Sequence, residues 1–199
     1  MTRRVSSVWS AFLVAVLMIA IPVVYAQAPS EFATEPDKGM ANAHESFVRG
    51  DMNKAAEHLK KAAAYVHKEG AKVAKESKES VMKAGDQLSK LGDEVKKGSV
   101  KSADQLKKTF AQVDHSLAKA WHATAEQSQK SGKDASDALK KAGTGLEGAA
   151  KWSGTKLQDG TQASVDGLKK AGKVSTNEVG KVFKSLGDGI ADVGQKLSS

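Results

Sequence analysis

The sequence contains no cysteine, few aromatic residues and only three prolines. Without cysteine, neither a disulfide framework nor a thiolate metal site can form in these 199 residues. Aromatic residues make up 5% of the chain, so few side chains are large enough to fill a deep core. No proline follows Pro36, and the rest of the chain is rich in the helix formers Ala, Lys, Gln, Glu and Leu. We therefore expect an all-α fold that is held together by helix packing.

Catalytic and metal-binding motifs are also missing. The chain has no glycine-rich loop after a strand, no His-Glu-x-x-His and no nucleophile elbow, so we expect no enzyme and no cofactor. The histidines are the only candidate metal ligands: His44, His58, His67, His115 and His122. His115 and His122 share a helix face but lie two turns apart, about 10.5 Å, too far to share one tetrahedral ion. We expect no metal site and interpret the histidines as surface or packing residues.

The distribution of charge argues against nucleic-acid binding. The formal net charge is +8, but lysines alternate with aspartate and glutamate along the chain instead of forming a block. This pattern is typical of solvated helix faces, and we expect no nucleic-acid binding.

The first 28 residues resemble a secretory signal peptide. Two arginines precede an apolar run over residues 11–21, which is short for a bilayer span. Val24 and Ala26 are placed for cleavage after Ala26, and cleavage after Ala28 is the alternative. We expect a periplasmic or secreted protein, with an uncleaved membrane anchor as the other possibility. Residues 29–37 have two prolines and no periodicity, and we interpret them as a linker.

Residues 38–131 are expected to form a helical hairpin and then long helices. Apolar residues at steps of three and four predict a hairpin over residues 38–66, with the turn at Gly50 and Asp51. The pattern continues to Trp121, which we expect in the core. The helix break is expected at residues 97–99, with Ser102 as the next N-cap.

The hairpin resembles a single tetratricopeptide repeat over residues 46–62. Gly50 occupies the turn, Met52 the usual aromatic position, and Ala55 and Ala62 the close-packing positions. The motif does not recur at a 34-residue spacing, and such units need neighbours to form a superhelix. The peptide-binding groove of that family is therefore not implied here, and we expect the hairpin to cap the next helix.

Residues 132–199 form a glycine-rich region with an eleven-residue repeat. An apolar residue recurs at every eleventh position: Ala135, Leu146, Leu157, Leu168, Val179 and Ile190. Eleven residues make three helical turns plus roughly 20°, so this column predicts one long surface helix, as in right-handed coiled coils. Twelve of the 18 glycines lie here, and each lowers helix propensity by about 1 kcal/mol relative to alanine. We expect this half to be only partly folded alone.

The apolar stripe of this half is the candidate functional face. We expect it to bind a membrane surface or partner helices through these residues: Leu146, Leu157, Leu168, Val179, Val182, Phe183, Leu186, Ile190, Val193 and Leu197. The stripe is densest after Asn177, and flanking lysines can gain from anionic lipid.

Lysine-, alanine- and glycine-rich stretches in this half carry a resemblance to two known families. Residues 138–143 read Ala-Leu-Lys-Lys-Ala-Gly, and residues 167–173 read Gly-Leu-Lys-Lys-Ala-Gly-Lys. Over residues 135–197 the repeat is similar to that of group 3 late-embryogenesis-abundant proteins and of exchangeable apolipoproteins. The resemblance implies a hydrated chain that folds into helix on drying or on lipid. The chain lacks the proline punctuation of apolipoproteins.

Two functions remain open at this point. The first is an exported, non-enzymatic helical protein that binds a membrane surface or partner helices, including copies of itself, as an envelope stress protectant. The second is a periplasmic helical bundle that binds a small ligand or metal through its first half. The sequence also allows the C-terminal half simply to pack on the first half, and does not decide whether the helices fold back or stay extended.

Export can be tested directly by intact mass. We expect the protein in the envelope fraction to begin at Gln27 or Pro29, because the charged, apolar and small-residue segments occur in the order of a cleavable signal. A mass that retains residues 1–26 would contradict cleavage and indicate a tethered protein.

Overall fold

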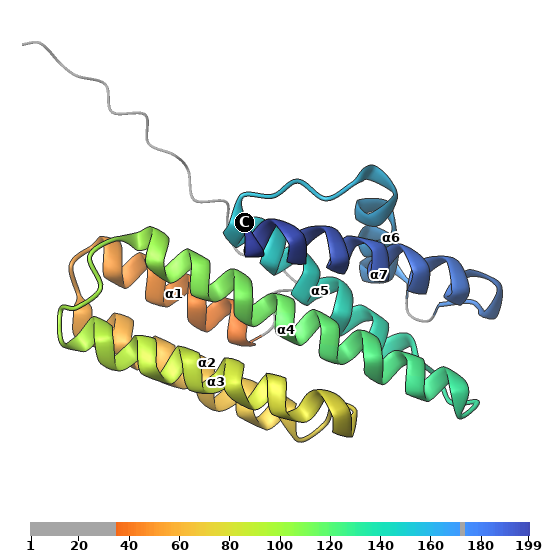
Figure 1. The fold of residues 1–199 in the computed structure, drawn as a ribbon, viewed down its shortest axis with the longest axis horizontal. Helices are drawn as coiled ribbons and strands as arrows, with labels where there is room; N and C mark the ends of the chain where they lie inside the picture. Colours follow the sequence, from red (N-terminus) through yellow and green to blue (C-terminus); the bar gives the residue numbers. More distant parts are fainter. Residues whose placement is uncertain (1–34, 172–173) are drawn as a thin grey trace, which may run out of the picture.

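The computed structural model describes residues 35–171 and 174–199, which form seven α-helices joined by turns (Figure 1). The helices are α1 (Glu35–Val48), α2 (Met52–Gly70), α3 (Lys75–Lys96), α4 (Ala103–Lys130), α5 (Ser136–Ser153), α6 (Asp159–Lys170) and α7 (Thr176–Ser198). No strand occurs in these two ranges. The expected all-α fold is confirmed, and the helices fold back on one another as a bundle.

The N-terminal hairpin is also confirmed. Gly50 has a φ of 81°, which glycine adopts without strain, and the side chain of Asp51 accepts a hydrogen bond from the Lys54 backbone N–H at 3.1 Å. A Cβ placed on Gly39 would lie 3.0 Å from Cβ of Ala62, so α1 and α2 approach closely where both residues are small.

The start of α1 lies inside the segment that we expected to be a linker. Residues 35–37 are helical, and Pro36 fits because the first N–H groups of a helix have no intrahelical acceptor. The expected signal peptide and the rest of the linker lie outside the described residues.

Helix α4 is the longest helix and lies between two hydrophobic clusters. Figure 1 shows α2 and α3 on one side of it and α5 to α7 on the other. Phe110 and Val113 of α4 belong to the first cluster, with α1 to α3, whereas Ala118 and Trp121 belong to the second, with α5 to α7. The expected burial of Trp121 is confirmed, since 8% of its surface is exposed.

The turns on either side of α3 differ in how well the sequence predicted them. The break before α4 occurs where expected, with Gly98 at a φ of 68° and Ser102 at the N-cap. The break between α2 and α3, at residues 71–74, lies a few residues after the end expected for the hairpin at residue 66, and it contains neither glycine nor proline. The backbone N–H of Ala74 donates to Oγ1 of Thr124 in α4 at 2.9 Å, so a tertiary contact helps to hold this turn.

The prediction of one long helix over residues 135–197 is wrong. The chain breaks after α5, where Gly154 has a left-handed φ of 69°, and again between α6 and α7. Leu146, Leu157 and Leu168 are nevertheless all buried in the second cluster. Folding the repeat into separate pieces lets its apolar column line one core, which a single extended helix would leave exposed to water.

Helix α5 packs closely on α4 because its contact face has small residues. A Cβ on Gly145 would lie 2.9 Å from the carbonyl oxygen of Asp114 and 3.0 Å from the backbone nitrogen of Ala118. By contrast, a Cβ on Gly160, Gly167 or Gly180 would meet nothing within 4 Å. The glycines of this half are therefore of two kinds. Glycines at a helix contact allow close packing, which offsets their low helix propensity, whereas glycines in open positions only weaken the helix, as expected.

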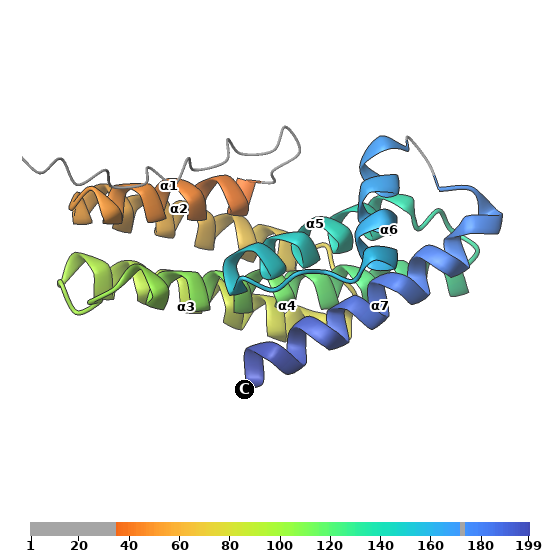
Figure 2. The same cartoon turned by 90° about the horizontal axis from the view of Figure 1, so that it is seen from above.

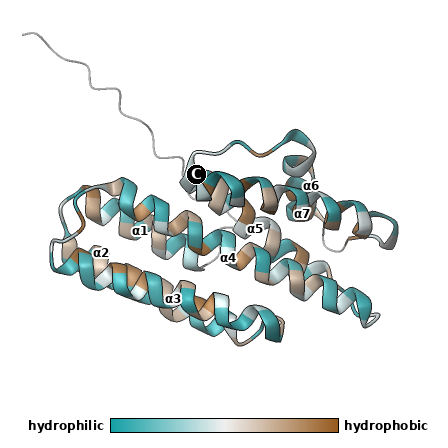
Figure 3. Ribbon diagram, in the orientation of Figure 1, coloured by the Kyte–Doolittle hydropathy of each residue, from teal (hydrophilic) through white to brown (hydrophobic). Residues whose placement is uncertain are grey.

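Hydrophobic residues are spread over the helices and alternate with hydrophilic ones (Figure 3). Among the helices of the described ranges, none is long and apolar enough to cross a membrane.

The two kinds of glycine predict opposite effects of alanine. Gly145→Ala is expected to lower the free energy of unfolding by about 1–3 kcal/mol, because the new methyl group meets backbone atoms that cannot move alone. Gly180→Ala is expected to raise it by about 0.5–1 kcal/mol, because the position is helical and open. Urea unfolding of both variants measures the difference. Stabilisation by alanine at both positions would contradict the close contact of α4 and α5.

Candidate functional site

The ten residues of the expected membrane or partner face all lie at the second hydrophobic cluster. Six of them are buried: Leu146, Leu157, Leu168, Leu186, Ile190 and Val193. The other four are partly buried and pack against the same cluster: Val179, Val182, Phe183 and Leu197. In this conformation the rest of the chain occupies the face, chiefly α4 and α5.

Two histidines of α4 form hydrogen bonds to the backbone of α7. Nε2 of His115 lies 2.9 Å from the carbonyl oxygen of Ile190, and Nε2 of His122 lies 3.0 Å from that of Phe183. A carbonyl only accepts, so Nε2 donates in both bonds. The histidines are seven residues apart, as are the carbonyls, and the order is reversed because α4 and α7 run antiparallel. We call these two bonds the histidine–carbonyl pairs.

Glycines make room for both histidine–carbonyl pairs. A Cβ on Gly194 would lie 2.8 Å from Nε2 of His115, and a Cβ on Gly187 would lie 3.4 Å from Nε2 of His122. The His122 ring also stacks on Phe183, with 4.0 Å between the ring centroids. Burial lowers the pKa of His115, and the hydrogen bond to Ile190 offsets only part of this effect, which favours the neutral ring at pH 7. The sequence placed the two histidines on one face but gave no sign of their acceptors, which are backbone atoms of a distant helix.

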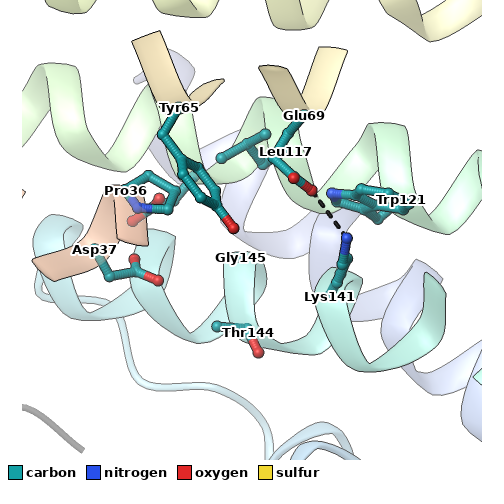
Figure 4. A pocket seen from close by; sticks show the side chains of 10 residues that line it. Pro36, Asp37, Tyr65, Glu69, Leu117, Trp121, Lys141, Thr144 and Gly145 are labelled. Carbon is teal, nitrogen blue, oxygen red and sulfur yellow. Dashed lines mark hydrogen bonds and ion pairs between the residues drawn. The ribbon is translucent and has the colours of Figure 1, made fainter. Parts of the chain in front are cut away.

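A small cavity with several polar side chains lies between α1, α2, α4 and α5 (Figure 4). Its volume of about 30 Å³ has room for about two water molecules. Its polar lining comes from residues that the sequence analysis did not single out: Asp37, Tyr65, Glu69, Asp114, Lys141 and Thr144. Isolated polar residues on helices carry no periodic signal, so only the fold brings them together.

Glu69 anchors α2 to α5 from within this cavity. Its side chain is 5% exposed and accepts hydrogen bonds from Nζ of Lys72 and, at 2.9 Å, from Nζ of Lys141. Burial acts to raise the pKa of Glu69, but the two lysines outweigh it and hold the pKa below its usual value. Nζ of Lys141 also lies 4.0 Å from the ring centroid of Trp121.

Asp114, which is buried, and Asp37, which is half-buried, form a carboxyl pair that joins α4 to α1. Asp114 is 1% exposed, and its Oδ2 has no hydrogen-bond partner among the described residues. Burial, followed by the charge and hydrogen bond of Asp37, raises the pKa of Asp114 well above its usual value, and Lys151 only partly opposes this. A Cβ on Gly148 would overlap Oδ2 of Asp114 and lie 3.0 Å from Oδ1 of Asp37. The absence of that Cβ leaves space for the two carboxyl groups, and the raised pKa of Asp114 favours its protonated form.

The histidine positions give no metal centre in the described ranges. No group of three or more His, Cys, Asp or Glu side chains able to hold a metal ion occurs there. His44 lies beside Trp152, with 5.8 Å between the ring centroids, and Nε2 of His67 lies 3.1 Å from Oδ1 of Asp86.

The carboxyl pair predicts a pH-dependent stability. Folded Asp114 holds its proton more tightly than the unfolded chain does, so stability falls as pH rises from about 3.9, the usual pKa, through the raised pKa. Asp114→Asn keeps a neutral hydrogen-bonding group at every pH. We expect it to raise the free energy of unfolding at pH 7 by about 1–2 kcal/mol and to change it little at pH 4.

Urea unfolding between pH 4 and pH 8 measures this effect, with Asp188→Asn as the control. Asp188 is exposed and paired with Lys184, so its loss should change stability by less than about 0.5 kcal/mol. A stability difference between Asp114→Asn and the unaltered protein that stays the same from pH 4 to pH 8 would contradict the raised pKa of Asp114.

Comparison with known proteins adds no further constraint to this geometry. No family model, curated protein or solved structure matches the chain.

Proposed function

We propose that the chain is an exported, non-enzymatic helical protein whose helix α7 binds an anionic membrane surface. One observation supports this best: α7 carries a dense apolar stripe, yet polar histidine–carbonyl pairs help to dock it. Such a helix can exchange its place on the bundle for a place in a lipid headgroup layer.

The position of α7 favours release. Helix α7 crosses the bundle obliquely on its outside (Figure 2). Val182 and Phe183 remain partly exposed while docked. Release would leave the short turns among α1 to α5 in place, so α7 can separate without unfolding the first cluster.

Three terms enter the free energy of releasing α7: transfer of its apolar stripe, exposure of the cluster left behind, and loss of the histidine–carbonyl pairs. Apolar residues of α7 such as Leu186 and Ile190 would leave one apolar environment for another. The cluster left behind contains alanines but also large apolar residues such as Leu146, which lies against α7 at Gly189. Exposing these side chains to water opposes release, and the transfer of the α7 stripe into lipid offsets this cost. Each histidine–carbonyl pair adds about 0.5–1.5 kcal/mol to docking.

Lysines of α7 are free to meet anionic headgroups. Within the described ranges, Lys184 pairs with the exposed Asp188 at 2.6 Å and Lys196 with the partly buried Asp192 at 3.0 Å, each one turn away. Exposed pairs of this kind contribute little stability, so they yield easily to phosphate groups. Such binding is compatible with a role as an envelope stress protectant.

A helical protein partner is the second candidate, and a second copy of this chain is included in it. It is favoured by the fact that the stripe of α7 already packs on helices α4, α5 and α6. The alternative of a small ligand in the first half has weaker support, because the cavity there holds only about two waters.

Vesicle co-sedimentation with three variants tests the proposal. His115→Ala with His122→Ala removes the histidine–carbonyl pairs but keeps the stripe, so it should favour undocking by about tenfold and raise vesicle binding. Phe183→Asp with Ile190→Asp should abolish the binding that α7 provides. His58→Ala, which removes a histidine of α2, is the matched control and should behave as the unaltered protein.

A thermal melt shows whether each variant folds, and vesicle binding of the folded variants then decides between the alternatives. Equal binding by all variants would show that α7 is not the attachment element. Binding that falls in the histidine variant would show that the docked bundle binds, not a released helix. Vesicles of phosphatidylcholine alone give the reference, since they lack anionic headgroups.

A further inference from the structure

An open groove of about 550 Å³ lies where the start of α4 and the ends of α5 and α7 meet. Its charged lining consists of one acid, Asp104, and four lysines: Lys107, Lys108, Lys151 and Lys196. Trp152 forms part of the wall. The groove therefore has an excess of three positive side chains, drawn from three helices that are distant in sequence.

The groove differs from single exposed lysines in bringing lysines of three helices together. About half of the lysines in the described ranges pair with an acid, often one helical turn away, as in the pairs Lys61–Glu57, Lys83–Glu79 and Lys130–Glu126. In the groove, Lys107 pairs with Asp104 at 3.2 Å and Lys196 pairs with Asp192 at 3.0 Å. Lys108 and Lys151 form no ion pair within the described ranges. Two ammonium groups are thus available to a ligand at once.

Trp152 anchors the wall of the groove to the core. His44 lies beside it, with 5.8 Å between the ring centroids. Burial, and then the charge of Lys107, lower the pKa of His44; Asp104 opposes this, and Lys151 adds a smaller lowering. Trp152 packs edge-on against Phe110, with 5.0 Å between ring centroids, and Nζ of Lys151 lies 5.2 Å from its ring. Its orientation is therefore held by the core beneath it.

We propose that this groove binds a phosphate group, with Lys108 and Lys151 as the direct partners. Ammonium groups attract phosphate as compact point charges, and a tryptophan beside them suits the boundary between headgroups and acyl chains. The phosphate is that of an anionic lipid headgroup or of a free phosphate ester. The lipid source rests on the proposed function of α7, which supplies Lys196, whereas binding of free phosphate does not.

Lysine footprinting of the full chain tests the site residue by residue. An acylating reagent modifies exposed lysines, and mass spectrometry gives the rate at each one. The arms are inorganic phosphate, vesicles of phosphatidylglycerol with phosphatidylcholine, and vesicles of phosphatidylcholine alone. We expect acylation of Lys108 and Lys151 to slow by about threefold, as two-thirds occupancy would give, in one or both of the first two arms. The reference lysines Lys75 and Lys78, which are exposed at the start of α3, should not change.

A pair of matched variants separates specific binding from general charge attraction. Lys108→Gln with Lys151→Gln removes two charges from the groove, and Lys75→Gln with Lys78→Gln removes two charges far from it. The groove variant should weaken phosphate binding by about tenfold or more, and the α3 variant by less than about twofold. A thermal melt checks that both variants fold.

The outcomes distinguish the two proposals. Protection by inorganic phosphate without vesicle binding supports the groove with a free phosphate ester and refutes the membrane role of α7. Vesicle binding that needs Phe183 and Ile190 but not Lys108 and Lys151, with no protection by inorganic phosphate, refutes the groove and leaves the role of α7 standing. Protection in neither arm, or equal protection of Lys75 and Lys78, also overturns the phosphate site.

Discussion

The close contact between α4 and α5 is the constraint on which the rest of the structure depends. Gly145 lets the backbone of α5 approach the carbonyl of Asp114, and no larger side chain fits there. This approach places Lys141 within reach of Glu69 and brings Gly148 over the carboxyl pair. It also sets the surface on which α7 lies. The polar cavity and the docking of α7 are therefore both consequences of small residues at one helix contact.

Helix α4 connects every element to which a function has been assigned. Its first face completes the core with α1 to α3, and its second face carries the histidines that hold α7. Its first turns carry Lys107 and Lys108 of the basic groove. A change in the docking of α7 also moves Lys196, so the groove and the attachment helix are mechanically coupled through α4 and α5.

The sequence predicted features that arise from local periodicity and failed where distant contacts decide. The hairpin turn at Gly50, the break at Gly98 and the burial of Trp121 follow from spacing and turn chemistry alone. The eleven-residue column does not distinguish one long helix from several short ones, because its period is the same in both. The prediction of a single helix therefore failed. The carboxyl pair, the histidine–carbonyl pairs and the groove could not be predicted, because each joins residues more than 40 positions apart or uses a backbone atom as partner.

The seven-residue spacing on α7 has a geometric consequence. Gly187 and Gly194 lie beside the two histidines, and Gly180 continues the series with open space around it. A slide of α7 by two turns, about 10.5 Å, would bring Gly187 to His115 and Gly180 to His122. The core positions that Leu186, Ile190 and Val193 occupy would then be taken by Val179, Phe183 and Leu186. These residues are also apolar. The hydrogen bonds alone thus do not define a unique register, and the fit of Leu186, Ile190 and Val193 in the second cluster selects the register that the structure shows.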